Sequence, residues 1–195
     1  MRRAPWWSLL SSGCPPVLLV GSWTIAQVRQ GPAYDPAKQT LSVLASYGAS
    51  SYWLMTGTLL VLGLCYVATA HALRTAAPAG RMALAGGGVC ALTLTLVPAP
   101  STGGALEHGA VAAVGLVLLA VWPPLAALRG TEAAPWGLRF DVSLAASAVM
   151  CASALWFLAE LQSAGVPGVA ERVVTFAQAL WPFLVVVSCR RWRMA

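Results

Sequence analysis

The side chain best suited to acid–base chemistry is Glu160, which lies near the C-terminal end of a long apolar stretch. A carboxylate there opposes the dipole of a helix, and Trp156, four residues earlier, would share its helical face. Because an unpaired charge in hydrocarbon costs at least about 2.5 kcal/mol, Glu160 is expected to be paired, hydrated or protonated. An apolar, aromatic setting would make it a candidate general acid. The alternative is that Glu160 lies among the lipid headgroups.

Asp35 is the second candidate catalytic acid. It precedes Pro36, and Asp at an N-cap followed by Pro at the first helical position starts a helix. We therefore expect a short amphipathic helix over residues 36–46, lying in the membrane interface. Asp35 could also face a central site, paired with Lys38 or Arg172.

Glu107 and His108 complete the candidate catalytic set, at the start of another apolar segment. Negative charge in the first turn of a helix complements its dipole, which accounts for Glu107 without a function, and the same reasoning covers Glu171. An imidazole at this depth is either a hydrogen-bonded packing residue or a proton carrier.

Aromatic and polar side chains could line a site for an apolar ligand near these acids. The candidates for ligand binding are Trp23, Tyr34, Trp53, Trp156, Glu171, Gln178 and Trp181. Trp23, Trp156 and Trp181 are expected in the outer half of the membrane, where their π faces could stabilise a cationic group. The alternatives are ordinary packing and interfacial belts for the tryptophans, and an interhelical hydrogen bond for Gln178.

The composition is that of a membrane protein. Of 195 residues, 58% are hydrophobic and only 9% are charged, whereas soluble domains are near a quarter charged. The net charge of +6 does not indicate a nucleic-acid partner, because the basic residues form no patch. Five scattered cysteines and two histidines give no metal-ligand spacing, so we expect no metal and no cofactor.

Hydropathy predicts an all-α bundle of six transmembrane helices in one domain, residues 1–195. The expected spans are Trp6–Ala26, Tyr52–Leu73, Met82–Val97, Leu106–Leu128, Leu138–Leu161 and Val169–Cys189. The third span is short, and its run of glycines, residues 86–88, indicates close helix packing.

Charge supports the same topology and gives its orientation. With the N-terminus inside, nine of the 12 Lys and Arg residues fall on the inner side, so both termini are expected in the cytoplasm. The outer side then collects the acids Asp35, Glu107, Glu160 and Glu171.

Several short motifs resemble a bacterial membrane family, domain of unknown function 998. They are Tyr34-Asp35-Pro36, the run Thr40–Ala45, Trp53-Leu54-Met55, Val97-Pro98, the Gly104–Gly109 region with His108, and Glu171-Arg172. The resemblance implies a six-helix membrane protein and singles out Asp35, His108 and Arg172 without giving them roles.

Two functions fit these patterns. The first is an outer-facing pocket for a lipid or isoprenoid, with proton-initiated, metal-independent terpenoid cyclisation as its chemistry. This layout is similar in kind to that of small membrane-embedded terpene cyclases. The second is a non-catalytic protein of the cell membrane that binds lipid or docks a partner. A transporter is disfavoured, because no span carries a mid-membrane charge.

Overall fold

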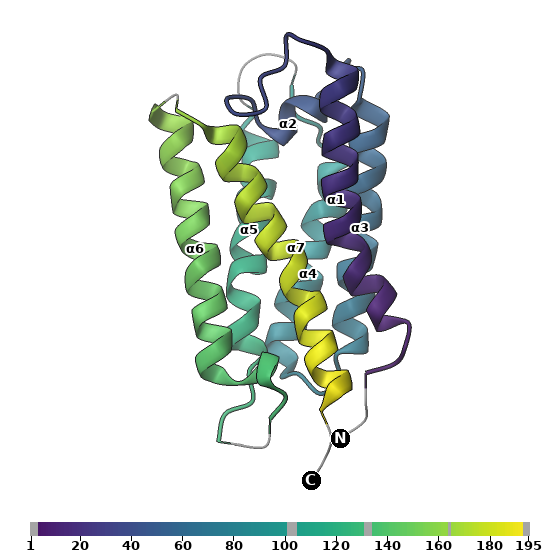
Figure 1. The fold of residues 1–195 in the computed structure, drawn as a ribbon, viewed down its shortest axis with the longest axis vertical. Helices are drawn as coiled ribbons and strands as arrows, with labels where there is room; N and C mark the ends of the chain where they lie inside the picture. The colour runs from purple at the N-terminus through teal and green to yellow at the C-terminus, as the bar shows by residue number, and fades with distance from the viewer. Residues whose placement is uncertain (1–3, 101–104, 131–133, 164, 193–195) are drawn as a thin grey trace.

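The computed structural model describes residues 4–100, 105–130, 134–163 and 165–192. This part of the chain is helical, with a single isolated β-bridge between Leu128 and Arg139. The helices are α1 (Ser8–Gln30), α2 (Leu41–Leu44), α3 (Tyr52–Ala72), α4 (Pro78–Leu94), α5 (Leu106–Ala126), α6 (Phe140–Ser163) and α7 (Pro167–Arg191), with a 3-10 turn, η1 (Trp136–Leu138), before α6 (Figure 1). The predicted all-α fold is confirmed for these residues.

Five of the described helices are long and apolar enough to cross a membrane: α1, α3, α5, α6 and α7. The third expected span corresponds to α4, which has 17 residues. The six-span count therefore stays a prediction.

The long helices form a closed ring in chain order. Each packs against the next along the chain, and α7 packs against both α6 and α1 (Figure 1). α1 begins and α7 ends at one end of the bundle, which we call the terminal end; α2 lies at the opposite end, the cap end. Short connections between antiparallel neighbours favour this arrangement.

Glycines bring α3, α4 and α5 close together. A Cβ atom on Gly63 would lie 2.7 Å from the Gly88 carbonyl oxygen, and one on Gly88 would lie 2.7 Å from the Gly63 oxygen. A Cβ on Gly87 would lie 2.6 Å from the Leu119 side chain. The close packing expected from the glycine run is thus confirmed, and backbones in direct contact are typical of membrane helix interfaces.

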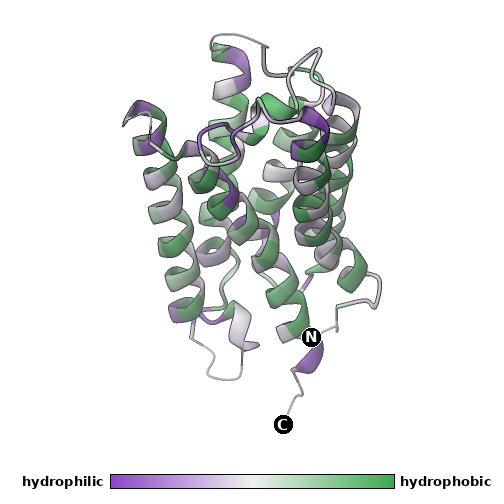
Figure 2. Cartoon of the chain, turned by 45° about the horizontal axis from the view of Figure 1, so that its top comes forward, coloured by the Kyte–Doolittle hydropathy of each residue, from purple (hydrophilic) through white to green (hydrophobic). Residues whose placement is uncertain are grey.

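Polar residues gather at the two ends and apolar residues cover the middle (Figure 2). The two ends differ in their described basic residues. The terminal end carries Arg74, Arg81, Arg129, Arg139, Arg190 and Arg191, and the cap end carries Arg29, Lys38 and Arg172. The partition of charge expected from the sequence therefore corresponds to the two ends of the bundle.

Candidate functional site at the cap end

The cap segment, residues 31–51, connects α1 to α3 and covers the cap end (Figure 1). The helix expected over residues 36–46 is wrong in its extent, because only Leu41–Leu44 are helical. Asp35 instead closes a turn: its Oδ1 accepts from Ala37 N at 2.9 Å and its carbonyl accepts from Gln39 N at 2.8 Å. The carbonyl of Ala37 accepts from Gly168 N of α7 at 3.0 Å, so the oxygen that a longer helix would use internally is already bonded to another helix.

Arg172 of α7 holds the cap segment in place. Its Nη1 donates to the carbonyls of Pro36 at 2.8 Å, Gln39 at 3.4 Å and Gly168 at 2.7 Å. Its Nη2 donates to the Tyr34 hydroxyl at 2.7 Å. One guanidinium therefore joins the first turn of α7 to both sides of the Asp35 turn, a use of arginine's rigid fork of donors that lysine cannot reproduce.

Tyr34 and Trp23 form the walls around this guanidinium. The Arg172 Cζ atom lies 5.9 Å from the Tyr34 ring centre and 5.8 Å from the Trp23 ring centre, within cation–π range. Tyr34 is only 6% exposed, and burial raises the pKa of its phenol although the neighbouring Arg172 lowers it. The hydroxyl stays protonated at neutral pH and donates to Gln39 O at 3.1 Å.

Glu171 caps α2 from the neighbouring helix. Its Oε2 accepts a hydrogen bond from Leu41 N, the first residue of α2, whose own N-cap residue Thr40 makes no side-chain cap. We expected Glu171 in the first turn of its own helix. That was wrong, because α7 begins at Pro167 and Glu171 lies beyond the first turn.

His108 connects α5 to two other segments. Its Nδ1 lies 2.9 Å from the Val97 carbonyl and its Nε2 lies 3.2 Å from Ser42 Oγ. Because a carbonyl can only accept, Nδ1 carries a proton, and in the neutral ring Nε2 accepts from the Ser42 hydroxyl. These bonds match the packing alternative for His108. Its catalytic role stays a prediction.

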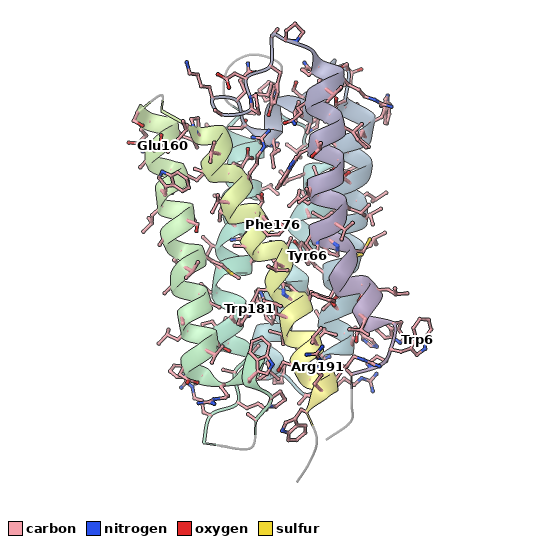
Figure 3. All side chains as sticks on the ribbon, viewed as in Figure 1. Trp6, Tyr66, Glu160, Phe176, Trp181 and Arg191 are labelled. Atoms are coloured by element: carbon pink, nitrogen blue, oxygen red, sulfur yellow. The ribbon has the colours of Figure 1, made fainter. Side chains whose placement is uncertain are left out.

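Glu160 closes the turn between α6 and α7. Its Oε1 accepts from Trp156 Nε1 at 2.9 Å, and its Oε2 accepts from Val166 N at 2.7 Å (Figure 3). A Cβ on Gly165 would overlap the Glu160 carboxylate, so with any other residue at position 165 this carboxylate would have to shift. Trp156 and Glu160 therefore do share one helical face, as their spacing predicts, whereas the role of Glu160 as a general acid stays a prediction.

The four acids share the cap end without contacting one another. Asp35 and Glu107 are exposed, and among the described residues no hydrogen bond or ion pair joins any two of Asp35, Glu107, Glu160 and Glu171. The expected pairing of Asp35 with Lys38 or Arg172 is also not found, since the described ion pair is Arg139–Asp141. No group of three potential metal ligands occurs in the described part of the chain.

The remaining ligand-binding candidates lie in different environments. Gln178 is 1% exposed and donates to the Leu116 carbonyl of α5 at 2.9 Å, the interhelical bond given as its alternative. Trp181 packs edge-to-face on Trp136, 6.2 Å between ring centres, toward the terminal end (Figure 3). Its expected place in the same half as Trp23 was wrong. Trp53 is 81% exposed at the cap end, with its ring 5.0 Å from that of Tyr52.

Arg172, the central residue of the cap end, was singled out by the resemblance but was given no role among the candidate site residues. Gly168 was missed, although a Cβ there would overlap the carbonyls of Pro36 and Gln39. A sequence signal existed for both: Pro167-Gly168 opens a helix, and Arg172 is one of the few basic residues on the acid-rich side.

This architecture, five long apolar helices in a six-helix ring, defines a multi-pass membrane protein. The chain belongs to the family described as "Protein of unknown function (DUF998)", whose model matches residues 14–188. The resemblance noted in the sequence is thus confirmed over nearly the whole chain. Comparison with curated proteins and with solved structures gives no match.

Proposed function

We propose that the chain crosses the membrane six times, with the terminal end in the cytoplasm, and that its cap end binds the apolar chain of a lipid or isoprenoid. The observation that carries this proposal is an ordered cap segment beside exposed aromatic and aliphatic side chains. Those side chains, the cap-end apolar rim, are Tyr47 (73% exposed), Trp53 (81%), Leu96 (82%) and Leu106 (93%).

The rim lies where the cap segment meets the connection between α4 and α5. Tyr47 N in the cap segment donates to Ala99 O in the α4–α5 connection at 3.3 Å, which brings the cap segment beside the segments that carry Leu96 and Leu106. The Tyr47 and Tyr52 rings lie 5.5 Å apart in an edge-to-face arrangement. Aromatic rings at the ends of spans prefer the headgroup level, which supports contact between the rim and the first carbons of a lipid chain.

The acids favour binding over catalysis. Asp35, Glu160 and Glu171 each accept a backbone N–H that a loop or helix terminus would otherwise leave unpaired. These hydrogen bonds stabilise the fold of the cap end, and that structural role is enough to explain a carboxylate at each of the three positions.

Six spans are supported by the length of α4 and the position of the termini. An α-helix of 17 residues is about 25 Å long, and hydrogen-bonded turns continue it to Val97, so it reaches nearly across about 30 Å of hydrocarbon. An even number of spans also places both termini on one side, as the ring does (Figure 1).

Reporter fusions test the six-span topology: a periplasmic phosphatase joined after residue 48 should be active and one joined after residue 192 inactive. Activity at both positions would refute six spans.

Ligand binding is tested with a farnesol that carries a photoreactive diazirine, incorporated with the protein into nanodiscs. We expect labelled peptides to map to the cap-end apolar rim, and Trp53→Ala to reduce the labelling. The matched control is Trp6→Ala, a tryptophan 66% exposed at the terminal end, which should leave the labelling unchanged (Figure 3). Equal loss in both variants, or label spread evenly over the lipid-facing helices, would refute a cap-end site.

A proton-initiated cyclase is the second candidate, favoured by the Trp156–Glu160 pair. In that reaction a carboxylic acid protonates an alkene, the carbocation closes a carbon–carbon bond, and a carboxylate removes a proton, so the product is an isomer of the substrate. Glu160→Gln would then abolish the formation of a cyclic isomer, detected by gas chromatography, without reducing photolabelling. If wild-type protein and Glu160→Gln give the same products, the cyclase candidate fails and the binding proposal stands.

A further inference from the structure

The turn between α3 and α4 carries a second, separate group of charged residues at the terminal end. We define the basic turn as His71, Arg74 and Arg81. Arg81 Nε donates to the Ala70 carbonyl at 2.9 Å, and Arg74 Nη2 lies 3.4 Å from His71 Nε2. Since Ala70 and His71 are adjacent, these contacts bring both guanidinium groups to the last turn of α3.

The basic turn is held rigidly by α5. Ala77 N donates to the Ala126 carbonyl at 3.0 Å, and a Cβ on Gly80 would overlap the Ala126 backbone. α4 therefore begins directly against the end of α5. A site fixed in this way loses little conformational entropy when a ligand binds.

The arginines of the basic turn have no acidic partner in the described part of the chain. At the terminal end the described acid is Asp141, which is bonded to Arg139 at 3.1 Å. The hydrogen bond of Arg81 uses Nε, so its terminal nitrogens have no described partner, and Arg74 is exposed. Within the described residues, the terminal nitrogens of Arg81 and the exposed Arg74 are therefore not neutralised by a carboxylate.

We propose that the basic turn binds the phosphate of an anionic phospholipid, such as phosphatidylglycerol. Guanidinium groups bind phosphate oxygens through paired hydrogen bonds, and basic sites between transmembrane helices recognise acidic headgroups. With α3 and α4 crossing the membrane as proposed, the end of α3 and the start of α4 would lie at headgroup level, which favours a lipid phosphate over one from solution. The site lies at the opposite end from the cap-end apolar rim, so it does not depend on the proposed cap ligand.

Thermal unfolding in detergent micelles tests the proposal, with phosphatidylglycerol, phosphatidylcholine or inorganic phosphate added. Phosphatidylglycerol should raise the Tm of the wild-type protein more than the other two additions do. Arg74→Gln with Arg81→Gln should lose at least half of that rise. The matched control, Arg139→Gln, removes an arginine that already has a carboxylate partner, and it should keep the rise.

Arg74→Gln alone keeps the test decisive if the double variant does not fold, because the described contact of the Arg74 side chain is with the His71 side chain and not with the backbone. We expect it to reduce the rise in Tm. The proposal is overturned if Arg139→Gln loses as much as Arg74→Gln, which would indicate general attraction to basic residues. It is also overturned if phosphatidylcholine or inorganic phosphate raises the Tm as much as phosphatidylglycerol.

Discussion

The contact between Gly63 and Gly88 gives the most direct test of how this bundle is held together. Each glycine, replaced by alanine, would place its new methyl carbon 2.7 Å from the other's carbonyl oxygen. Carbon–oxygen contacts between helices are ordinarily 3.3–3.6 Å, so α3 and α4 would have to separate by roughly 0.6 Å or more. Overpacking of this kind costs about 1–3 kcal/mol. The higher helix propensity of alanine offsets up to about 1 kcal/mol of that.

We therefore expect Gly63→Ala and Gly88→Ala each to lower the free energy of unfolding by about 1–2 kcal/mol. The matched control is Gly57→Ala, two turns earlier on α3, where a Cβ would meet no atom within 4 Å. That variant should be neutral or up to about 1 kcal/mol more stable, because only the propensity changes. Unfolding in mixed micelles, followed by far-ultraviolet circular dichroism, provides the measurement.

The double variant sharpens the test. Once one methyl group has separated the helices, the second meets a wider gap, so the double variant should be less destabilised than the two single variants added together. If Gly63→Ala were as stable as Gly57→Ala, the close approach of α3 and α4 would not contribute to stability and this reasoning would be refuted.

Two other predictions concern the cap end and the bundle interior. Arg172→Gln should release the cap segment and lower the free energy of unfolding by about 2 kcal/mol, because several charge-assisted hydrogen bonds are lost. Limited proteolysis should then cut within residues 31–51 faster than it does in the control variant Lys38→Gln. Unchanged cleavage would contradict the anchoring role. Gln178→Leu should change the free energy of unfolding by less than about 1 kcal/mol, because hydrogen bonds between membrane helices contribute little. Gln178→Ala should lower the free energy of unfolding by about 2–3 kcal/mol, because it leaves a cavity. Equal effects of the two variants would contradict this reasoning.

The helices were predictable from the sequence because their length and apolar character are local properties. The boundaries were less so: α1 runs to Gln30, four residues beyond the expected Ala26, and it continues through Pro15 and Pro16. Proline ends helices in most settings, but the apolar membrane environment favours helical backbone on both sides of it.

The cap segment could not be predicted, because its conformation is set by residues more than a hundred positions away. The turn at Asp35 was visible in the sequence. The hydrogen bonds that Gly168 N donates to the Ala37 carbonyl and Arg172 donates to the Pro36 carbonyl were not visible, and these bonds limit α2 to four residues. The acids were assigned to one end correctly, but their partners proved to be nearby or distant backbone N–H groups. Side-chain spacing contains no information about such partners.

The closed ring of helices bears on how the protein is made. Because every neighbouring pair from α1 to α6 is also consecutive in the chain, these helices can assemble in order as the ribosome delivers them to the membrane. The final helix is different, since it closes the circle against the first and also brings Gly168, Glu171 and Arg172 to the cap segment. Synthesis of α7 therefore both closes the ring of helices and anchors the cap segment, and a chain that stopped before α7 would have an open ring and a loose cap segment.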